Sequence, residues 1–152
     1  DKLRAIQGKR SVDSIHKELG LIMWDFVGMG RTAEGLKEGI KRIDAIKKEF
    51  WTNVYIPGTA DHLNNELEKA LRLADFIEIG RLMAVDALHR EESCGGHFRE
   101  EYQTPEGEAL RQDDKFSYVG CWKYMGEDQE PQLIKEPLDY EFTERKTRNY
   151  KN

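Results

Sequence analysis

Apolar residues recur at intervals of three and four along three long segments, and this periodicity constrains the fold more than any other feature of the sequence. Such spacing places the apolar side chains on one face of an α-helix. We predict a first helix that is capped by Ser11 or Asp13 and ends at residues 28–30, where two glycines occur. Its apolar stripe consists of Val12, Ile15, Leu19, Ile22 and Phe26, widened by Met23 and Trp24.

The other two stripes predict two further helices. The second helix follows a cap at Thr32, and its stripe is Leu36, Ile40, Ile43, Ile46 and Phe50. A turn at Pro57-Gly58 precedes the third, which we expect from about 61 to 93 with Thr59 or Asp61 as its cap. Its stripe is Leu63, Leu67, Ala70, Ala74, Ile77, Ala84 and Leu88, broadened by Leu71, Leu73, Leu82 and Val85. A helix apolar over more than one face contacts two neighbours, or one neighbour and another domain.

The composition changes after two adjacent glycines, Gly95 and Gly96. Residues 97–115 are charged and indicate an extended arm, whereas 116–124 are rich in β-formers and predict a strand. After a turn at 126–131, residues 133–142 alternate well enough for a returning strand that Pro137 interrupts. A lone hairpin is marginal in water, so we expect it to pack on the helices or on a further domain.

The predicted fold is therefore mainly α. Residues 1–96 form a three-helix up-down-up bundle, similar to a spectrin repeat, and residues 97–152 form an extended arm and a small β-hairpin. Apolar residues make up 38% and charged residues 35% of the 152 residues, which indicates a narrow core.

Charge and composition exclude several classes of partner. The net charge is −5 without a basic stripe, which argues against binding to nucleic acid. No apolar run approaches the ~20 residues that span a bilayer, so direct membrane insertion is not expected. The chain has no signal-peptide pattern, and its two distant cysteines allow one disulfide, although reduced thiols are the better expectation. It begins at Asp1 without Met, which suggests an excised piece.

The polar residues around the double glycine are the candidate functional residues. His89, Cys94 and His97 have spacing conceivable for zinc, but no fourth ligand is evident. His97 as an acid–base catalyst lacks a nucleophile or a paired carboxylate nearby in sequence. For Arg99, a salt bridge is a better hypothesis than an anion-binding role. For residues 113–114, a turn or a helix cap is a better hypothesis than a cation site. We therefore predict no catalytic, cofactor-binding or metal-binding residue.

The same segment carries a family resemblance. Residues 90–99, which read Arg-x-Glu-Ser-Cys-Gly-Gly-His-x-Arg, resemble the Arg-x-Glu-Ser-Arg-Gly-Ala-His-x-Arg segment of succinate dehydrogenase and fumarate reductase flavoprotein subunits. Residues 111–116, Arg-Gln-Asp-Asp-Lys-Phe, resemble the Arg-Asp-Asp-x-x-Phe/Trp motif of that family, and the tail from 135 to 151 is similar to tails of one branch. Cys94 replaces the family's Arg, Gly96 its Ala, Gln112 is inserted, and 117–120 replace a polar Leu-Lys-His-Thr run. These departures suggest a variant branch.

The resemblance implies a C-terminal helical domain that supports an enzyme interconverting succinate and fumarate. The resemblance also implies that FAD is held by an N-terminal Rossmann-type domain. This sequence contains no Gly-x-Gly-x-x-Gly, so the fragment alone is expected to hold no cofactor and to be inactive. Its implied partners are that flavin-binding domain and an iron–sulfur subunit, on the inner face of the cell membrane in a peripheral, cytoplasmic location. A bared docking face favours self-association of the fragment.

The residues that we assign to interdomain docking lie in the two motifs. They are Arg90, Glu92, Ser93, Gly95, Gly96, His97, Arg99, Arg111 and Asp113. Two alternatives remain open at this point. One is the C-terminal domain of an L-aspartate oxidase-like flavoenzyme, against which the β tail argues. The other is a free-standing helical module that binds a partner helix or adds a strand to another sheet.

Overall fold

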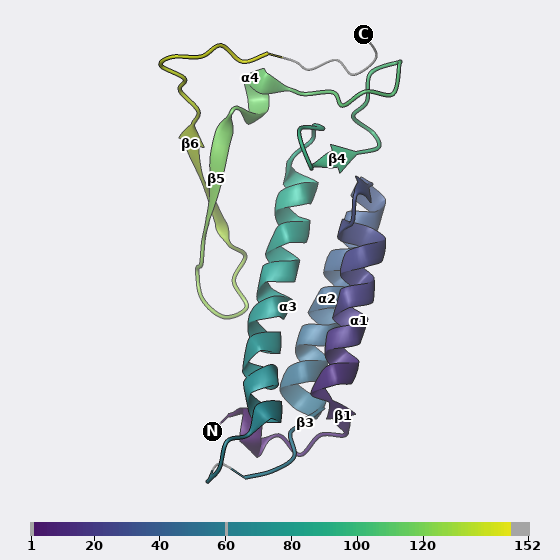
Figure 1. The fold of residues 1–152 in the computed structure, drawn as a ribbon, viewed down its shortest axis with the longest axis vertical. Helices are drawn as coiled ribbons and strands as arrows, with labels where there is room; N and C mark the ends of the chain where they lie inside the picture. The colour runs from purple at the N-terminus through teal and green to yellow at the C-terminus, as the bar shows by residue number, and fades with distance from the viewer. Residues whose placement is uncertain (1, 60, 147–152) are drawn as a thin grey trace.

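A computed structural model describes residues 2–59 and 61–146 (Figure 1). Three long helices lie side by side, and each contacts the other two: α1 (Val12–Val27), α2 (Ala33–Asn53) and α3 (Asn65–His89). The chain runs up, down and up through them, which confirms the predicted bundle. No described helix is both long enough and apolar enough to cross a bilayer.

Side-chain caps fix where the helices begin. Ser11 accepts a hydrogen bond from the amide of Ser14 at 3.2 Å, and Thr32 accepts one from Gly35 at 3.0 Å, as expected. The predicted start of the third helix was wrong, because Asn64 is the cap and accepts from the Leu67 amide at 3.0 Å. Asn64 also donates to the Pro57 and Thr59 carbonyls, so it holds the preceding turn outside the helix.

The core follows the predicted stripes with three exceptions. Its fully buried members include Ile15, Leu36, Ile43, Phe50, Leu73 and Ile77. Trp24, Leu63 and Leu71 were expected on apolar faces but are 80%, 92% and 54% exposed. Trp24 follows the buried Ile22 by two positions, about 200° around a helix, and Leu63 precedes the first turn of α3. Trp24 and Leu63 therefore point away from the bundle.

Short parallel pairs close both ends of the bundle. At one end, after the 3-10 turn η1 (Leu3–Ala5), β1 (Arg10–Ser11) pairs with β3 (Val54–Tyr55). At the other end, β2 (Gly30–Arg31) pairs with β4 (Phe98–Arg99), which brings the start of the predicted arm onto the α1–α2 connection (Figure 1). The arm is thus packed on the bundle where it leaves α3, and it continues to the short helix α4 (Asp113–Phe116).

The predicted hairpin forms and lies along α3. Strand β5 (Tyr118–Lys123) pairs antiparallel with β6 (Gln132–Pro137), and the Trp122 indole donates to Asp86 of α3 at 2.8 Å (Figure 1). The returning strand ends at Pro137, so the expected continuation to 142 was wrong. Proline has no amide proton to extend the ladder. The last part of the family-like tail, 147–151, lies outside the described residues.

We predict that truncating a buried ring destabilises the bundle much more than truncating an exposed ring that was expected to be buried. Phe50→Ala removes a fully buried ring and should cost about 3–5 kcal/mol of unfolding free energy. Trp24→Ala removes a larger but exposed ring and should stay within about 0.5 kcal/mol of the parent chain. Urea unfolding of the two variants measures both values, and equal losses would contradict the packing described above.

Candidate docking site

The loop after α3 makes a tight turn with two glycines at its tip. Cys94 and His97 exchange two backbone hydrogen bonds of 2.8 and 3.0 Å, and Gly95 between them has a φ of +58°. Glycine adopts this left-handed conformation without steric cost. A methyl group built on Gly95 or Gly96 would meet no other atom within 4 Å. The tip is therefore exposed and open to contact from outside the described chain.

Arg99 is buried beneath this turn and terminates α3. It is 2% exposed, and its Nη1 donates to the carbonyls of Ala87 at 2.9 Å, Leu88 at 3.2 Å and Arg90 at 3.4 Å. The last carbonyls of a helix have no partner within the helix and carry its negative dipole end, so a cation there is favourable. The helix was expected to reach 93, but it ends at His89, where this guanidinium takes up its carbonyls.

Two further motif residues hold the turn internally. Ser93 is fully buried, accepts a hydrogen bond from the Arg99 amide at 2.8 Å and donates to the Arg99 carbonyl at 3.1 Å. Glu92 is 4% exposed and accepts from the Gln112 amide at 3.0 Å and from the Arg90 guanidinium at 3.2 Å. These buried polar groups are satisfied within this chain, so they shape the turn from below.

Arg90 attaches the hairpin to the end of α3. Its Nη2 donates to the Tyr118 carbonyl at 2.7 Å, and its guanidinium lies 4.9 Å from the centre of the Tyr118 ring. Lys135 lies 4.5 Å from the centre of the same ring, and the Tyr118 hydroxyl contacts His89 Nε2 at 2.7 Å. Cation–π contacts of this kind are favourable. The first strand of the hairpin is therefore fixed to the helix end.

His97 lies between cations and is held in one tautomer. Arg31 donates to its Nδ1 at 2.9 Å, and because arginine cannot accept, the ring proton is on Nε2, which faces the Arg90 carbonyl at 2.9 Å. Burial lowers the pKa of His97; the hydrogen bond to the Arg90 carbonyl opposes this, and the charges of Arg31 and Arg99 add to the lowering. Sequence reasoning did not single out Arg31, which lies 66 residues away.

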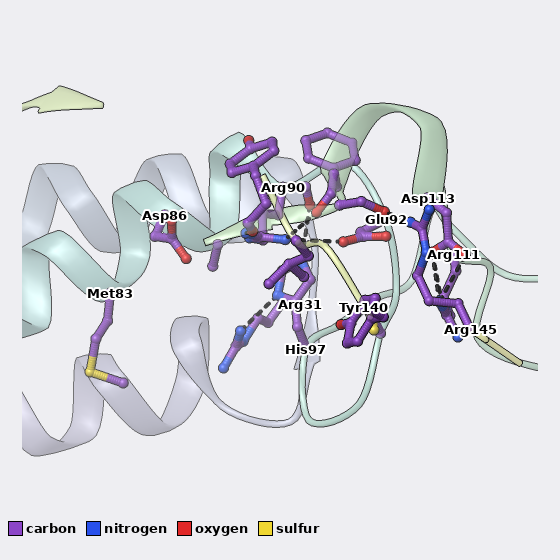
Figure 2. Close-up of a pocket in the computed structure, with 16 residues that line it drawn as sticks. Arg31, Met83, Asp86, Arg90, Glu92, His97, Arg111, Asp113, Tyr140 and Arg145 are labelled. Carbon is purple, nitrogen blue, oxygen red and sulfur yellow. Dashed lines mark hydrogen bonds and ion pairs between the residues drawn. The ribbon is translucent and has the colours of Figure 1, made fainter. Parts of the chain in front are cut away.

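These groups surround a pocket of about 420 Å³ at the end of the bundle (Figure 2). Its wall includes five of the nine predicted docking residues: Arg90, Glu92, His97, Arg111 and Asp113. Arg111 and Asp113 form a bidentate pair, with Nε to Oδ1 at 3.0 Å and Nη2 to Oδ2 at 2.8 Å, and Arg111 also donates to the Lys146 carbonyl at 3.0 Å. Of the other four, Ser93 and Arg99 are buried beneath the turn, while Gly95 and Gly96 form its exposed tip.

Of the three residues considered for zinc, both histidines have other partners, while Cys94 is a free, exposed thiol. His89 contacts Tyr118, and both ring nitrogens of His97 have protein partners. Within 2–59 and 61–146, no group of three His, Cys, Asp or Glu side chains is placed to hold a metal ion.

Comparison with known proteins adds context to this geometry. A family model described as the fumarate reductase flavoprotein C-term matches residues 16–150. The fumarate reductase flavoprotein subunit of Helicobacter pylori is 28% identical over 135 residues, 88% of this chain and 18% of its own length. An uncharacterized FAD-dependent oxidoreductase of Methanocaldococcus jannaschii is 29% identical over 67% of this chain and 18% of its own length.

Two further comparisons bear on the alternatives. An L-aspartate oxidase of Yersinia pestis is 33% identical over 88 residues, 56% of this chain and 15% of its own length. A solved variant of E. coli quinol fumarate reductase superposes with a TM-score of 0.81 and 25% identity, covering 95% of this chain and 24% of that one. This chain therefore spans less than a fifth of the curated relatives that it matches.

We predict that the guanidinium of Arg99 cannot be replaced by another cation. Arg99→Lys keeps the charge but loses the fork that reaches several carbonyls, and should cost about 2–3 kcal/mol of unfolding free energy. The control is Arg72→Lys, on an exposed i,i+4 pair with Glu68, which should change stability by less than about 0.5 kcal/mol. Urea unfolding measures both, and an unaffected Arg99→Lys variant would argue against the capping role.

A second prediction concerns pH. The folded pKa of His97 lies below its ordinary value of 6.5, so between those two values the unfolded chain binds more protons than the folded one. The contribution of His97 to the free energy of unfolding is fully present above about pH 6.5. It falls as the pH drops from there towards the folded pKa, by at most about 1.4 kcal/mol per pH unit for one proton. His97→Gln removes this contribution, so its melting temperature should fall less between pH 7 and 5.5 than that of the parent chain. Parallel curves for the two proteins would refute the assignment.

Proposed function

We propose, since this chain belongs to the fumarate reductase flavoprotein C-terminal family, that it is the C-terminal helical domain of the flavoprotein subunit of a succinate:quinone oxidoreductase. Its role there is structural: it docks on the flavin-binding part of the subunit. The observation that carries this proposal is the exposed double-glycine tip beside a charged pocket, at one end of a bundle whose core is already complete. We place the boundary of the bundle at residue 96 and assign 97–152 to contact with the bundle and the flavin domain.

The enzyme as a whole, in this proposal, interconverts succinate and fumarate. FAD supplies the redox chemistry when it is bound by the flavin domain. The described residues do not fit the dinucleotide themselves, because their parallel strand pairs are two residues long and form no βαβ unit with a glycine-rich turn. We therefore assign no catalytic or cofactor-binding residue to this chain, and we propose that it is inactive alone.

The proposed partners are the flavin-binding domain and an iron–sulfur subunit. Peripheral attachment to the inner face of the membrane, through such partners, is part of the same proposal. Separated from them, the chain should self-associate through exposed apolar residues that line a groove between α1 and α3, which include Phe76, Ile79 and Met83.

An L-aspartate oxidase-like flavoenzyme is the second candidate. The Yersinia pestis relative supports it, with 33% identity, although that match covers 56% of this chain. The Helicobacter pylori fumarate reductase subunit matches over 88%. Assay of the intact flavoprotein with succinate and with L-aspartate separates the two, and oxidation of L-aspartate alone would favour the second candidate.

Gly96→Val in the intact flavoprotein tests the docking role. The Gly96 backbone lies outside the left-handed region and the space around its Cα is open, so valine should cost the isolated chain little. Packed against a flavin domain, the same side chain would collide with it. We expect a lower ratio of flavin to protein after purification, measured by absorbance at 450 and 280 nm.

The comparison variant is Gly95→Val. Its φ of +58° adds backbone strain of about 1–2 kcal/mol, so this variant should lose flavin and also destabilise the chain by itself. Normal flavin content in purified Gly96→Val protein would count against docking through this tip. Lys41→Val on α2, a position that is 80% exposed and outside the tip, the pocket and the groove, controls for a general effect of surface substitution.

A further inference from the structure

The pocket at the end of the bundle carries an excess of positive charge. Four arginines and three carboxylates line it, together with His97, whose Nδ1 accepts a hydrogen bond from Arg31. The charged lining residues are Arg31, Arg90, Arg111, Arg145, Asp86, Glu92 and Asp113.

Each carboxylate already has a partner. Glu92 accepts from Arg90 and from the Gln112 amide, and Asp113 forms the bidentate pair with Arg111. Asp86 accepts from the indole of Trp122 at 2.8 Å. These contacts leave two of the four arginines of the pocket without a carboxylate.

Arg31 and Arg145 are those two arginines. Arg31 donates to the Val27 and Gly28 carbonyls and to the neutral ring of His97, and Arg145 donates to the Ser117 hydroxyl. Among residues 2–59 and 61–146, neither guanidinium has a carboxylate within ion-pair distance.

Arg31 is the more buried of the two. It is half-buried, and burial lowers the pKa of its guanidinium, which Asp86 offsets only in part. The carbonyls at the end of α1 that Arg31 Nε contacts favour a cation, and an anion beside its outer nitrogens would add a charge-assisted hydrogen bond. In the pocket wall, Arg111 and Asp113 give an example of a carboxylate held by a guanidinium fork (Figure 2).

The size and walls of the pocket define the ligand further. A volume of about 420 Å³ is far more than one carboxylate needs. Met83, Ala87, Leu138 and the ring of Tyr140 supply apolar wall between the polar groups. Sites with a mostly apolar lining and a few convergent polar groups bind molecules that have an apolar body and a polar end.

We propose that this pocket is a carboxylate-binding site, in which an acid group on an apolar stem pairs with Arg31 while Arg145 adds to the attracting charge. The group comes either from an acidic side chain elsewhere in the flavoprotein or from a free organic acid. Only the first source rests on the docking function proposed above.

Crystal structures of the full-length flavoprotein, without additive and soaked in 4-bromobenzoate, test the proposal. The bromine gives an anomalous signal that locates the probe. A protein carboxylate within 3.5 Å of Arg31 without additive identifies the first source. Bromobenzoate whose carboxylate is paired with Arg31 in the soaked crystal alone identifies the second. Solvent or chloride beside Arg31 in both crystals overturns the proposal.

Two variants of the same protein provide the control. Arg31→Gln should abolish the carboxylate contact, whereas Arg72→Gln, outside the pocket, should leave it unchanged. Since Arg31 also bonds the end of α1, occupancy in the crystal is the readout and stability is not. The same structures show separately whether any segment packs on the Gly95–Gly96 tip, so failure of docking and failure of the carboxylate site are distinguishable.

Discussion

The ion pair between Arg99 and Glu101 joins the end of α3 to the start of α2, two helices of opposite direction, and the double-glycine turn is built over it. Arg99 donates to the last carbonyls of α3, while Glu101 accepts from the Ala33 amide at the start of α2 at 2.5 Å, and the two side chains meet at 3.1 Å. A cation thus lies at the negative end of one helix and an anion at the positive end of the next. Burial alone would raise the pKa of Glu101, but the hydrogen bonds from Ala33 and Arg99 outweigh it and hold that pKa below its usual value.

This arrangement explains why a charged segment remains ordered with few apolar residues of its own. The arm gains its position from the parallel pairing of β4 with β2 and from polar groups that are buried in satisfied networks. Satisfied buried networks of this kind specify one geometry, because any displaced member leaves others without partners. The double-glycine tip and the pocket wall are consequently held in place by contacts within this chain.

Local signals allowed most of the fold to be predicted from the sequence. Apolar spacing located all three helices, Thr32 was recognised as a cap and Ser11 was one of two candidates, because both signals act within a few residues. Two errors show the limit of such signals. The third helix was expected to start at Thr59 or Asp61, but the cap is Asn64, which also contacts the preceding turn. Trp24 was assigned to the apolar face of the first helix, but its position places it on the exposed side. The hairpin was predicted, but its position along α3 depends on the hydrogen bond between Trp122 and Asp86. These residues are 36 positions apart, so no local signal links them.

The candidate site was predictable as a segment but not as a geometry. Residues 90–99 and 111–113 stood out through their resemblance to a family motif, whereas the roles of single residues follow from contacts between distant segments. Arg31 has no local signature at all, because only the pairing of β2 with β4 brings it to His97. The motif residues likewise divide into buried and exposed groups that only the three-dimensional contacts distinguish. Ser93 and Arg99 point inward and build the turn, so the surface left for a partner consists of the glycine tip and the pocket wall.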